Sequence, residues 1–181
     1  MTGDFYDRPV LDVAADMVGC RLVHGDTAGI IVETEAYHMS EAACHAYVGL
    51  TARTSVLFDS PGLAYVYRSY GIHWCMNMVG RRGSAVLIRA LGPTAGFDAM
   101  QERRGLTDVR ALCSGPGKLC QALAITGDHD GLALDAPPFQ VLPRMTEPDL
   151  VVGPRIGITK AVDQPWRFGL KGSRYVSRPF R

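Results

Sequence analysis

The spacing of apolar residues near the start of the chain predicts one helix and a β-hairpin. Residues 10–19 have the periodicity of a helix with one buried face, and Asp7-Arg8-Pro9 precedes them as a capping sequence. Residues 21–24 and 28–37 read as two strands, and His24-Gly25-Asp26 between them favours a hairpin turn. The chain is therefore expected to begin with a helix followed by two antiparallel strands.

Three dense β-like runs lie at the centre of the chain, after a polar and irregular stretch. The runs cover residues 63–70, 73–79 and 84–91. Gly71 and Arg81-Arg82-Gly83 separate them, so both joints are short and carry turn residues. This spacing predicts an antiparallel meander at the centre of the fold.

The second half of the chain mixes helices and short strands. Residues 97–104 read as a helix, and residues 113–125 as another, for which Ser114 can act as the cap. Short strands are expected at residues 156–159, 166–170 and 175–177. The chain lacks the regular strand–helix alternation of a parallel sheet. We therefore predict an α+β fold, a single domain over residues 1–181 in which a curved, mainly antiparallel sheet is flanked by helices.

Composition narrows the class of protein. The chain has 181 residues, of which 47% are hydrophobic and 20% charged, with a net charge of +1, as in an ordinary globular domain. No apolar run reaches the roughly 18 residues of a membrane span, and the N-terminus lacks a secretory signal. Five scattered cysteines without a CxxC pair are expected to be reduced and mostly buried. We therefore expect a cytoplasmic protein, or a nuclear one in a eukaryote, that is not secreted.

Charge is unevenly distributed along the chain. From Trp166 to the end the charged residues are all basic, namely Arg167, Lys171, Arg174, Arg178 and Arg181. Acids dominate between Asp128 and Asp149 instead. A protein with one basic face and one acidic face would orient on a polyanion. The alternative, which this feature favours equally, is a basic tail exposed to solvent.

Two glutamates follow a β-branched segment in the sequence IIVETEAY, residues 30–37. In a strand, Glu33, Glu35 and Tyr37 share one face, while the small residues between them share the other and can pack on a core. The face with the acids therefore lines a surface, a groove or a pocket. The alternative is a plain exposed strand face with two solvated acids.

Aromatic and polar residues in the central strands add candidate chemistry. Tyr65 and Tyr67 share a strand face and could form a stacking platform for a flat ring, with ordinary sheet core as the alternative. Asn77 and Arg89 lie within apolar strands and need partners if they are buried. Glu35 is the candidate partner of Arg89, and a glutamate held there could take a proton from water. A structural ion pair is the alternative.

The sequence SGPGK, residues 114–118, resembles a phosphate-binding helix start. Backbone N–H groups face outward at such a position, and Lys118 adds a positive charge. The segment lacks the GxxxxGK[ST] pattern of a nucleotide-binding loop, so ATP and GTP are not inferred. One backbone phosphate of a nucleic acid is the expected ligand, and an ordinary capped helix is the alternative.

Taken together, these blocks resemble the alkyladenine (3-methyladenine) DNA glycosylase family. The matching blocks, in the family's order, are VETEAY, AYVYRSYGIHWCMN, VLIRAL, LCSGPGKLCQAL, PRIGI and KGSRYVS. They span nearly the whole chain from the first helix onward. The resemblance implies an enzyme that flips alkylated or deaminated purines out of double-stranded DNA and hydrolyses the bond to deoxyribose. It implies an abasic product without strand cleavage, a monomer, and no metal or cofactor.

The resemblance also implies roles for individual residues. Glu35 corresponds to the base that activates water, and Arg89 to a residue that helps to hold that water and the phosphate of the lesion. The base pocket corresponds to Tyr37, His45, Tyr67 and Asn77, the DNA wedge to Tyr70 and Ile72, the phosphate contacts to Arg53 and Lys118, and a backbone segment near the water to 156–158. Glu33 is then the less important acid, expected to be structural or on the rim.

Two segments depart from the family pattern. Thr51-Ala52-Arg53-Thr54 replaces a common Thr-Pro-Arg-Asn, and His38-Met39-Ser40 replaces a Gly-Pro pair. Both segments should border the pocket, so they bear on the range of lesions and the shape of the loop. Two other functions remain open at this point. One is a non-catalytic module that binds damaged DNA, and the other is a glycoside hydrolase, which would need two well-separated carboxylates.

Overall fold

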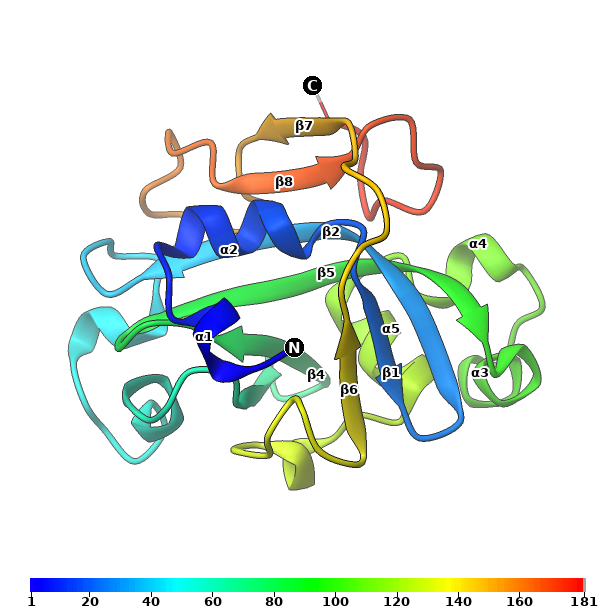
Figure 1. The fold of residues 1–181 in the computed structure, drawn as a ribbon, viewed down its shortest axis with the longest axis horizontal. Helices are drawn as coiled ribbons and strands as arrows, with labels where there is room; N and C mark the ends of the chain where they lie inside the picture. Colours follow the sequence, from blue (N-terminus) through cyan, green and yellow to red (C-terminus); the bar gives the residue numbers. More distant parts are fainter. Residues whose placement is uncertain (181) are drawn as a thin grey trace.

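A curved antiparallel sheet forms the centre of the molecule in this computed structural model, which describes residues 1–180 (Figure 1). Its strands are β1 (Arg21–His24), β2 (Thr27–His38), β3 (Ala64–Ser69), β4 (His73–Val79), β5 (Ser84–Ala95), β6 (Phe139–Leu142), β7 (Leu150–Gly153) and β8 (Arg167–Leu170). The main order is β3-β4-β5-β2-β1-β6, and β7 and β8 form a flap in which β8 pairs with β2. Strand β2 is therefore paired on both edges between Glu33 and Glu35, with β5 and β8.

Helices lie against the sheet and complete the α+β domain. They are α1 (Gly3–Tyr6), α2 (Val10–Met17), α3 (Phe97–Arg104), α4 (Val109–Leu112) and α5 (Pro116–Leu123), with 3-10 turns η1 (His45–Val48), η2 (Ser55–Phe58) and η3 (Gly127–His129). Helix α2 packs on β2, and α5 packs on β4 and β5. The Thr34 hydroxyl fixes α2 to the sheet by donating to the Ala14 carbonyl at 2.8 Å. Helices α2 and α5 thus cover strands that carry candidate site residues.

The main hydrophobic core lies between α2, the sheet and α5. Met17, Ile31, Met76, Ile88 and Leu91 are among its largest fully buried side chains. Truncating Ile88 to alanine in mid-strand would cost about 2–5 kcal/mol, through lost burial and the cavity left behind. The core therefore makes β2 and β5 a rigid base for the polar residues on their other faces.

The structure confirms the predicted fold class, the hairpin and the central meander. Strands β1 and β2 pair antiparallel with His24 opposite Thr27, which leaves Gly25 and Asp26 as a two-residue turn. Strand β4 pairs with both β3 and β5 in the predicted antiparallel sense. The helix predicted at residues 97–104 is confirmed as α3.

The two predicted helix caps are wrong. Helix α2 begins after Pro9 without a side-chain cap, and Asp7 instead accepts a hydrogen bond from Arg81 Nε at 3.0 Å. Helix α5 covers residues 116–123 and is preceded by Gly115, and the Ser114 side chain makes no capping bond. In both cases a proline adjoins or occupies the first helical position, where its fixed φ suits a helix start.

Only one of the three short strands predicted near the C-terminus forms, and it is β8. Residues 156–159 and 175–177 are irregular instead, while β6 and β7 were missed. The reason is visible in two backbone N–H groups. The Ile156 N–H donates to the Glu35 carboxylate and the Ser177 N–H to the Glu33 carboxylate, so neither serves a strand ladder.

The expected basic tail is also interrupted. Arg167 is only 3% exposed and pairs with Glu33, so it contributes no charge to the surface. Arg181, the last residue of that tail, lies outside the described residues. Within residues 1–180, no helix has both the length and the apolar character that crossing a membrane requires.

Candidate active site

A cavity of about 550 Å³ opens between the central strands and two loops. Strands β2 to β5 form one part of its wall, and residues 42–45 and 156–160 form another. Seven of the predicted site residues line it, namely Tyr37, His45, Arg53, Tyr67, Tyr70, Asn77 and Arg89. The structure thus brings together residues that lie as far apart in sequence as positions 37 and 89.

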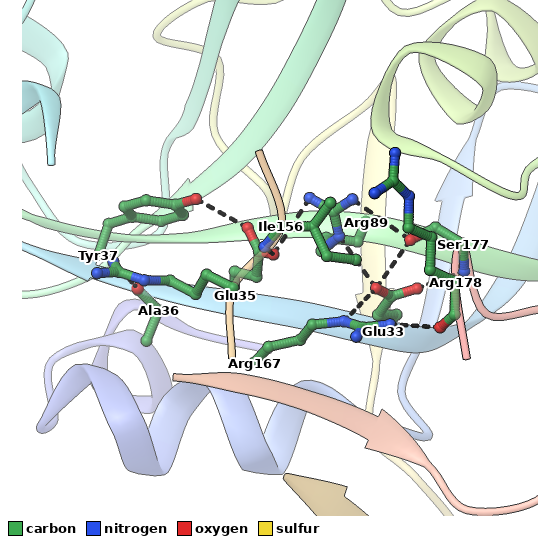
Figure 2. Close-up of polar contacts among 10 residues, drawn as sticks. Glu33, Glu35, Ala36, Tyr37, Arg89, Ile156, Arg167, Ser177 and Arg178 are labelled. Atoms are coloured by element: carbon green, nitrogen blue, oxygen red, sulfur yellow. Dashed lines mark hydrogen bonds and ion pairs between the residues drawn. The ribbon is translucent and has the colours of Figure 1, made fainter. Parts of the chain in front are cut away.

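Glu35 does not line this cavity, but its hydrogen-bond and ion-pair partners do (Figure 2 shows these contacts). Its Oε1 accepts a hydrogen bond from the Ile156 N–H at 2.7 Å and forms an ion pair with Arg89 Nη1 at 3.2 Å. Its Oε2 accepts a hydrogen bond from the Tyr37 hydroxyl at 2.8 Å. The side chain is 0% exposed, and all three partners line the cavity. The carboxylate is therefore one side chain away from the cavity, and a molecule there reaches it only if a partner moves.

The protonation of the residues around Glu35 follows from burial and neighbouring charge. Burial, and then the charge of Glu35, raise the pKa of Tyr37 far above its usual range, so this hydroxyl remains a donor. For Arg89, burial opposes the charged form, but Glu35 and Glu33 outweigh it and raise its pKa. Glu35 therefore contacts one permanent cation, Arg89, and two neutral hydrogen-bond donors, the Tyr37 hydroxyl and the Ile156 N–H.

Three rings from β3 and η1 form a group on the cavity wall. The His45 and Tyr67 rings lie 4.5 Å apart between centroids, nearly perpendicular at 75°. The Tyr65 hydroxyl lies 3.0 Å from His45 Nδ1 and orients the imidazole. Burial, and then the charge of Arg53, lower the pKa of His45, which favours its neutral form. From sequence, Tyr65 was paired with Tyr67 as a candidate stacking platform because they share a strand face, but it was not among the residues assigned to the base pocket.

Asn77 lies in the cavity wall on β4 and is only 5% exposed. Its amide Nδ2 donates to the Tyr65 carbonyl across the β3–β4 pair at 3.2 Å. This bond fixes the orientation of the amide group. Asn77 is therefore a rigid polar group on a wall that carries aromatic and aliphatic side chains together with the cations Arg53, Arg68, Arg89 and Lys160.

The β3–β4 hairpin ends in two exposed apolar side chains. Tyr70 is 88% exposed and Ile72 68%, although both are large and apolar. Tyr70 has a φ of 51°, a strained conformation for a non-glycine residue, and Gly71 follows it in the same region. The turn therefore projects both side chains into solvent beside the cavity that Tyr70 also lines.

The SGPGK segment lies against the turn end of this hairpin, at His73. A side chain at Gly117 would approach His73 Cβ to 2.9 Å, so only glycine allows this contact. Pro116 lines the cavity, and the exposed Lys118 ammonium lies 3.4 Å from the Ser114 hydroxyl. Lys118 is thus a surface cation two residues from the cavity-lining Pro116.

Arg155 and Glu41 form a buried ion pair that sequence reasoning missed. Arg155 Nη1 and Nη2 donate to the two Glu41 oxygens at 2.8 and 3.1 Å, and Nη1 also donates to the Ala36 carbonyl at 3.0 Å. The guanidinium lies 4.7 Å from the centre of the Tyr37 ring. Arg155 directly precedes Ile156, so this pair fixes two of the three partners of Glu35. No local pattern marks it, because its members are 114 positions apart.

Glu33 is buried among cations, which agrees with the structural role expected for it and not with the alternative position on the rim. It is 0% exposed and pairs with Arg89 and Arg167. The five cysteines are all free and buried, as predicted. Within residues 1–180, no group of three or more His, Cys, Asp or Glu side chains is placed to hold a metal ion.

Comparison with known proteins identifies the family of this chain. The sequence pattern of the methylpurine-DNA glycosylase (MPG) family matches residues 4–174. Relatives named "putative 3-methyladenine DNA glycosylase" include one from Rhodopseudomonas palustris (strain HaA2), 61% identical over 98% of this chain and 90% of the relative. Others are from Nitrobacter winogradskyi, 56% identical over 100% and 88%, and from Agrobacterium fabrum, 53% over 97% and 91%. The chain therefore belongs to the methylpurine-DNA glycosylase family, which are DNA-repair enzymes for alkylated purines.

Proposed function

We propose that this chain flips an alkylated purine out of double-stranded DNA and hydrolyses its N-glycosidic bond with a water activated by Glu35. The observation that carries the proposal is the placement of Glu35. It is bound to Arg89, Tyr37 and Ile156 directly behind a ring-lined cavity. A carboxylate in this position can accept a proton from a water that enters the cavity.

The hairpin tip supports a flipping step. Rotating a base out of the duplex costs a few kcal/mol, which an inserted side chain offsets by filling the vacated space. Tyr70 is exposed, apolar, and held in a tight turn beside the cavity. We assign Tyr70 the role of this wedge and place Ile72 next to it. Arg53 and Lys118 are the proposed phosphate contacts.

The rings around the cavity suit a purine that carries positive charge. A cation over an aromatic face gains about 0.5–2 kcal/mol relative to a neutral ring. Tyr37, Tyr67 and His45 come from three different elements and line one cavity. His45 favours its neutral form and so adds no repulsion toward a cationic base. Asn77 supplies a fixed polar group that can reject bases whose edge does not match it.

The reaction requires one local rearrangement. Water reaches Glu35 Oε2 when the Tyr37 hydroxyl leaves it, since the Ile156 N–H and Arg89 hold only Oε1. The water oxygen then attacks the anomeric carbon as the bond to the base breaks, and Glu35 takes the proton. A cationic base leaves as a neutral molecule with both electrons of the bond. Arg89 keeps the carboxylate in place throughout.

A non-catalytic damaged-DNA-binding module is the second candidate. The observation in its favour is that Glu35 is 0% exposed, with hydrogen bonds on both oxygens. Such a module would bind the lesion but release no base.

The two candidates are separated by a duplex oligonucleotide with a single alkylated purine. The proposal expects the wild type to release the base and the strand to break only after alkali. Glu35→Gln should release none while binding the duplex normally. Glu102→Gln, on the exposed face of α3, is the control and should behave as wild type. Breakage without alkali would instead indicate an amine nucleophile such as Lys160, which lines the cavity. No release by the wild type would favour the binding module.

A further inference from the structure

Glu33 is completely buried, yet the reaction above assigns it no task. Its Oε1 accepts hydrogen bonds from Arg89 Nε at 3.0 Å, Arg167 Nε at 2.7 Å and the Ser177 hydroxyl at 2.8 Å (Figure 2). Its Oε2 accepts one from the Ser177 N–H at 2.5 Å. Burying a carboxylate is costly unless donors saturate it, and these donors do so. A side chain bound this firmly can hold its partners in one geometry.

Arg89 divides its guanidinium group between the two glutamates. Its Nε and Nη2 form the two-pronged edge, and this edge points to Glu33 and to the Ser177 hydroxyl, at 3.0 and 3.3 Å. Only Nη1 reaches Glu35, at 3.2 Å. Two parallel bonds to one carboxylate are the preferred arrangement for arginine. Without Glu33, Arg89 would therefore turn this edge to Glu35 and occupy both of its oxygens.

We propose that Glu33 is a positioning residue that restricts Arg89 to a single contact with Glu35. Glu35 Oε2 then stays available for water once the Tyr37 hydroxyl has moved. This inference rests on the proposed function and deepens it. Charge supports the same role, because Glu33 and Glu35 balance Arg89 and Arg167 within one buried group. Removing the charge of Glu33 would leave one cation in excess beside Glu35.

The C-terminal segment is part of this arrangement. Ser177 donates to Glu33 through its N–H and its hydroxyl, 144 positions along the chain. Arg167 Nη2 donates to the Arg178 carbonyl at 2.5 Å and so holds the next residue. The hydroxyl of Ser177 is also the second acceptor for the edge of Arg89. Ser177 is therefore a second positioning residue, which acts through Glu33 and Arg89.

The test is a double-mutant cycle on the rate of base release under single-turnover conditions. Glu33→Gln should lower that rate about 10- to 100-fold, as small misplacements of catalytic groups do. Its affinity for a duplex with a non-cleavable abasic-site analogue should stay within about threefold of wild type. In an Arg89→Gln background, Glu33→Gln should change the rate by less than about twofold, since Glu33 acts through Arg89. A merely structural role predicts that the two effects multiply, and that result would overturn the proposal.

Asp16→Asn is the matched control for a loss of stability. Asp16 is also held by two arginines, Arg8 at 2.8 Å and Arg144 at 3.1 Å, but it lies outside the site. This variant should unfold at a lower temperature and keep the wild-type rate. If Glu33→Gln does not fold, Ser177→Ala carries the test, with an expected rate loss of about 2- to 10-fold that vanishes in the Arg89→Gln background.

The outcomes separate this inference from the proposed function. A wild type that releases no base contradicts the proposed function itself. A wild type that releases base, a Glu35→Gln variant that does not, and a Glu33→Gln variant with the wild-type rate contradict only the positioning role of Glu33.

Discussion

Replacing Tyr37 by phenylalanine isolates the hydroxyl that covers Glu35. The change removes one hydrogen bond, from the Tyr37 hydroxyl to Glu35 Oε2 at 2.8 Å, and keeps the ring in the cavity wall. A hydrogen bond to a charged group contributes about 1.5–3 kcal/mol to stability. In a domain of this size each kcal/mol shifts the melting temperature by about 2–4 °C. We therefore expect Tyr37→Phe to melt about 3–12 °C below wild type.

The same change should not impair the chemistry. In the proposed reaction the Tyr37 hydroxyl must leave Glu35 Oε2 before water can bind there, so its removal eliminates one step. Burial and the charge of Glu35 raise the pKa of this hydroxyl far above its usual range, and it is therefore a poor proton relay. We expect the single-turnover rate of base release in Tyr37→Phe to equal or exceed that of wild type.

Thermal unfolding and single-turnover base release on the same protein samples measure both effects. Tyr47→Phe is the control, because Tyr47 is 54% exposed and lies on the nearby turn η1. It should change neither quantity. A rate loss of tenfold or more in Tyr37→Phe, with the variant folded, would refute the reasoning and show that the hydroxyl takes part in the reaction.

Three further predictions follow from the site. Tyr70→Ala should lower base release from duplex DNA about tenfold or more and spare single-stranded substrate, whereas equal losses on both would contradict the wedge. Burial lowers the pKa of His45 and of His24, so both imidazoles resist protonation in the folded protein. Their contribution to the free energy of unfolding is therefore complete above about pH 6.5 and is lost as the pH decreases below this value. Unfolding at pH 5 and pH 7 measures this, and equal stability would contradict it. Duplex affinity should fall steeply with salt, and a flat response would argue against phosphate contacts.

The local sequence pattern was sufficient to predict the strands of the central sheet, but it was not sufficient to predict the structure of the C-terminal third of the chain. The β3–β4–β5 meander was predictable because its strands are adjacent in sequence and its turns carry glycine. Residues 156–159 and 175–177 look like strands by composition. Their backbones are used by buried carboxylates from β2, and no local rule gives partners so distant in sequence. The same reason explains why the Glu41–Arg155 pair was missed.

In the candidate site, too, some features could be predicted from the sequence and others could not. Alternation along a strand placed Glu33, Glu35 and Tyr37 on one face. In the structure Arg89 pairs with both glutamates, and the Tyr37 hydroxyl donates to Glu35 (Figure 2). The pairing of Arg89 with Glu35 was also predicted, as a consequence of an arginine in an apolar strand. The complete burial of Glu33 and Glu35 could not be predicted from the alternation of residues along the strand. Glu33 and Glu35 are both 0% exposed, because β2 is paired on both edges and loops cover the face that a single strand would leave open.

The most direct test of the account is the single-turnover rate of Glu35→Gln on a duplex with one alkylated purine, compared with wild type. The substitution keeps the size of the side chain and an acceptor for the Ile156 N–H, but an amide cannot take a proton from water. We expect a rate at least about 1000-fold below wild type, with binding of the duplex retained. A Glu35→Gln variant that releases the base within tenfold of the wild-type rate would contradict the central claim.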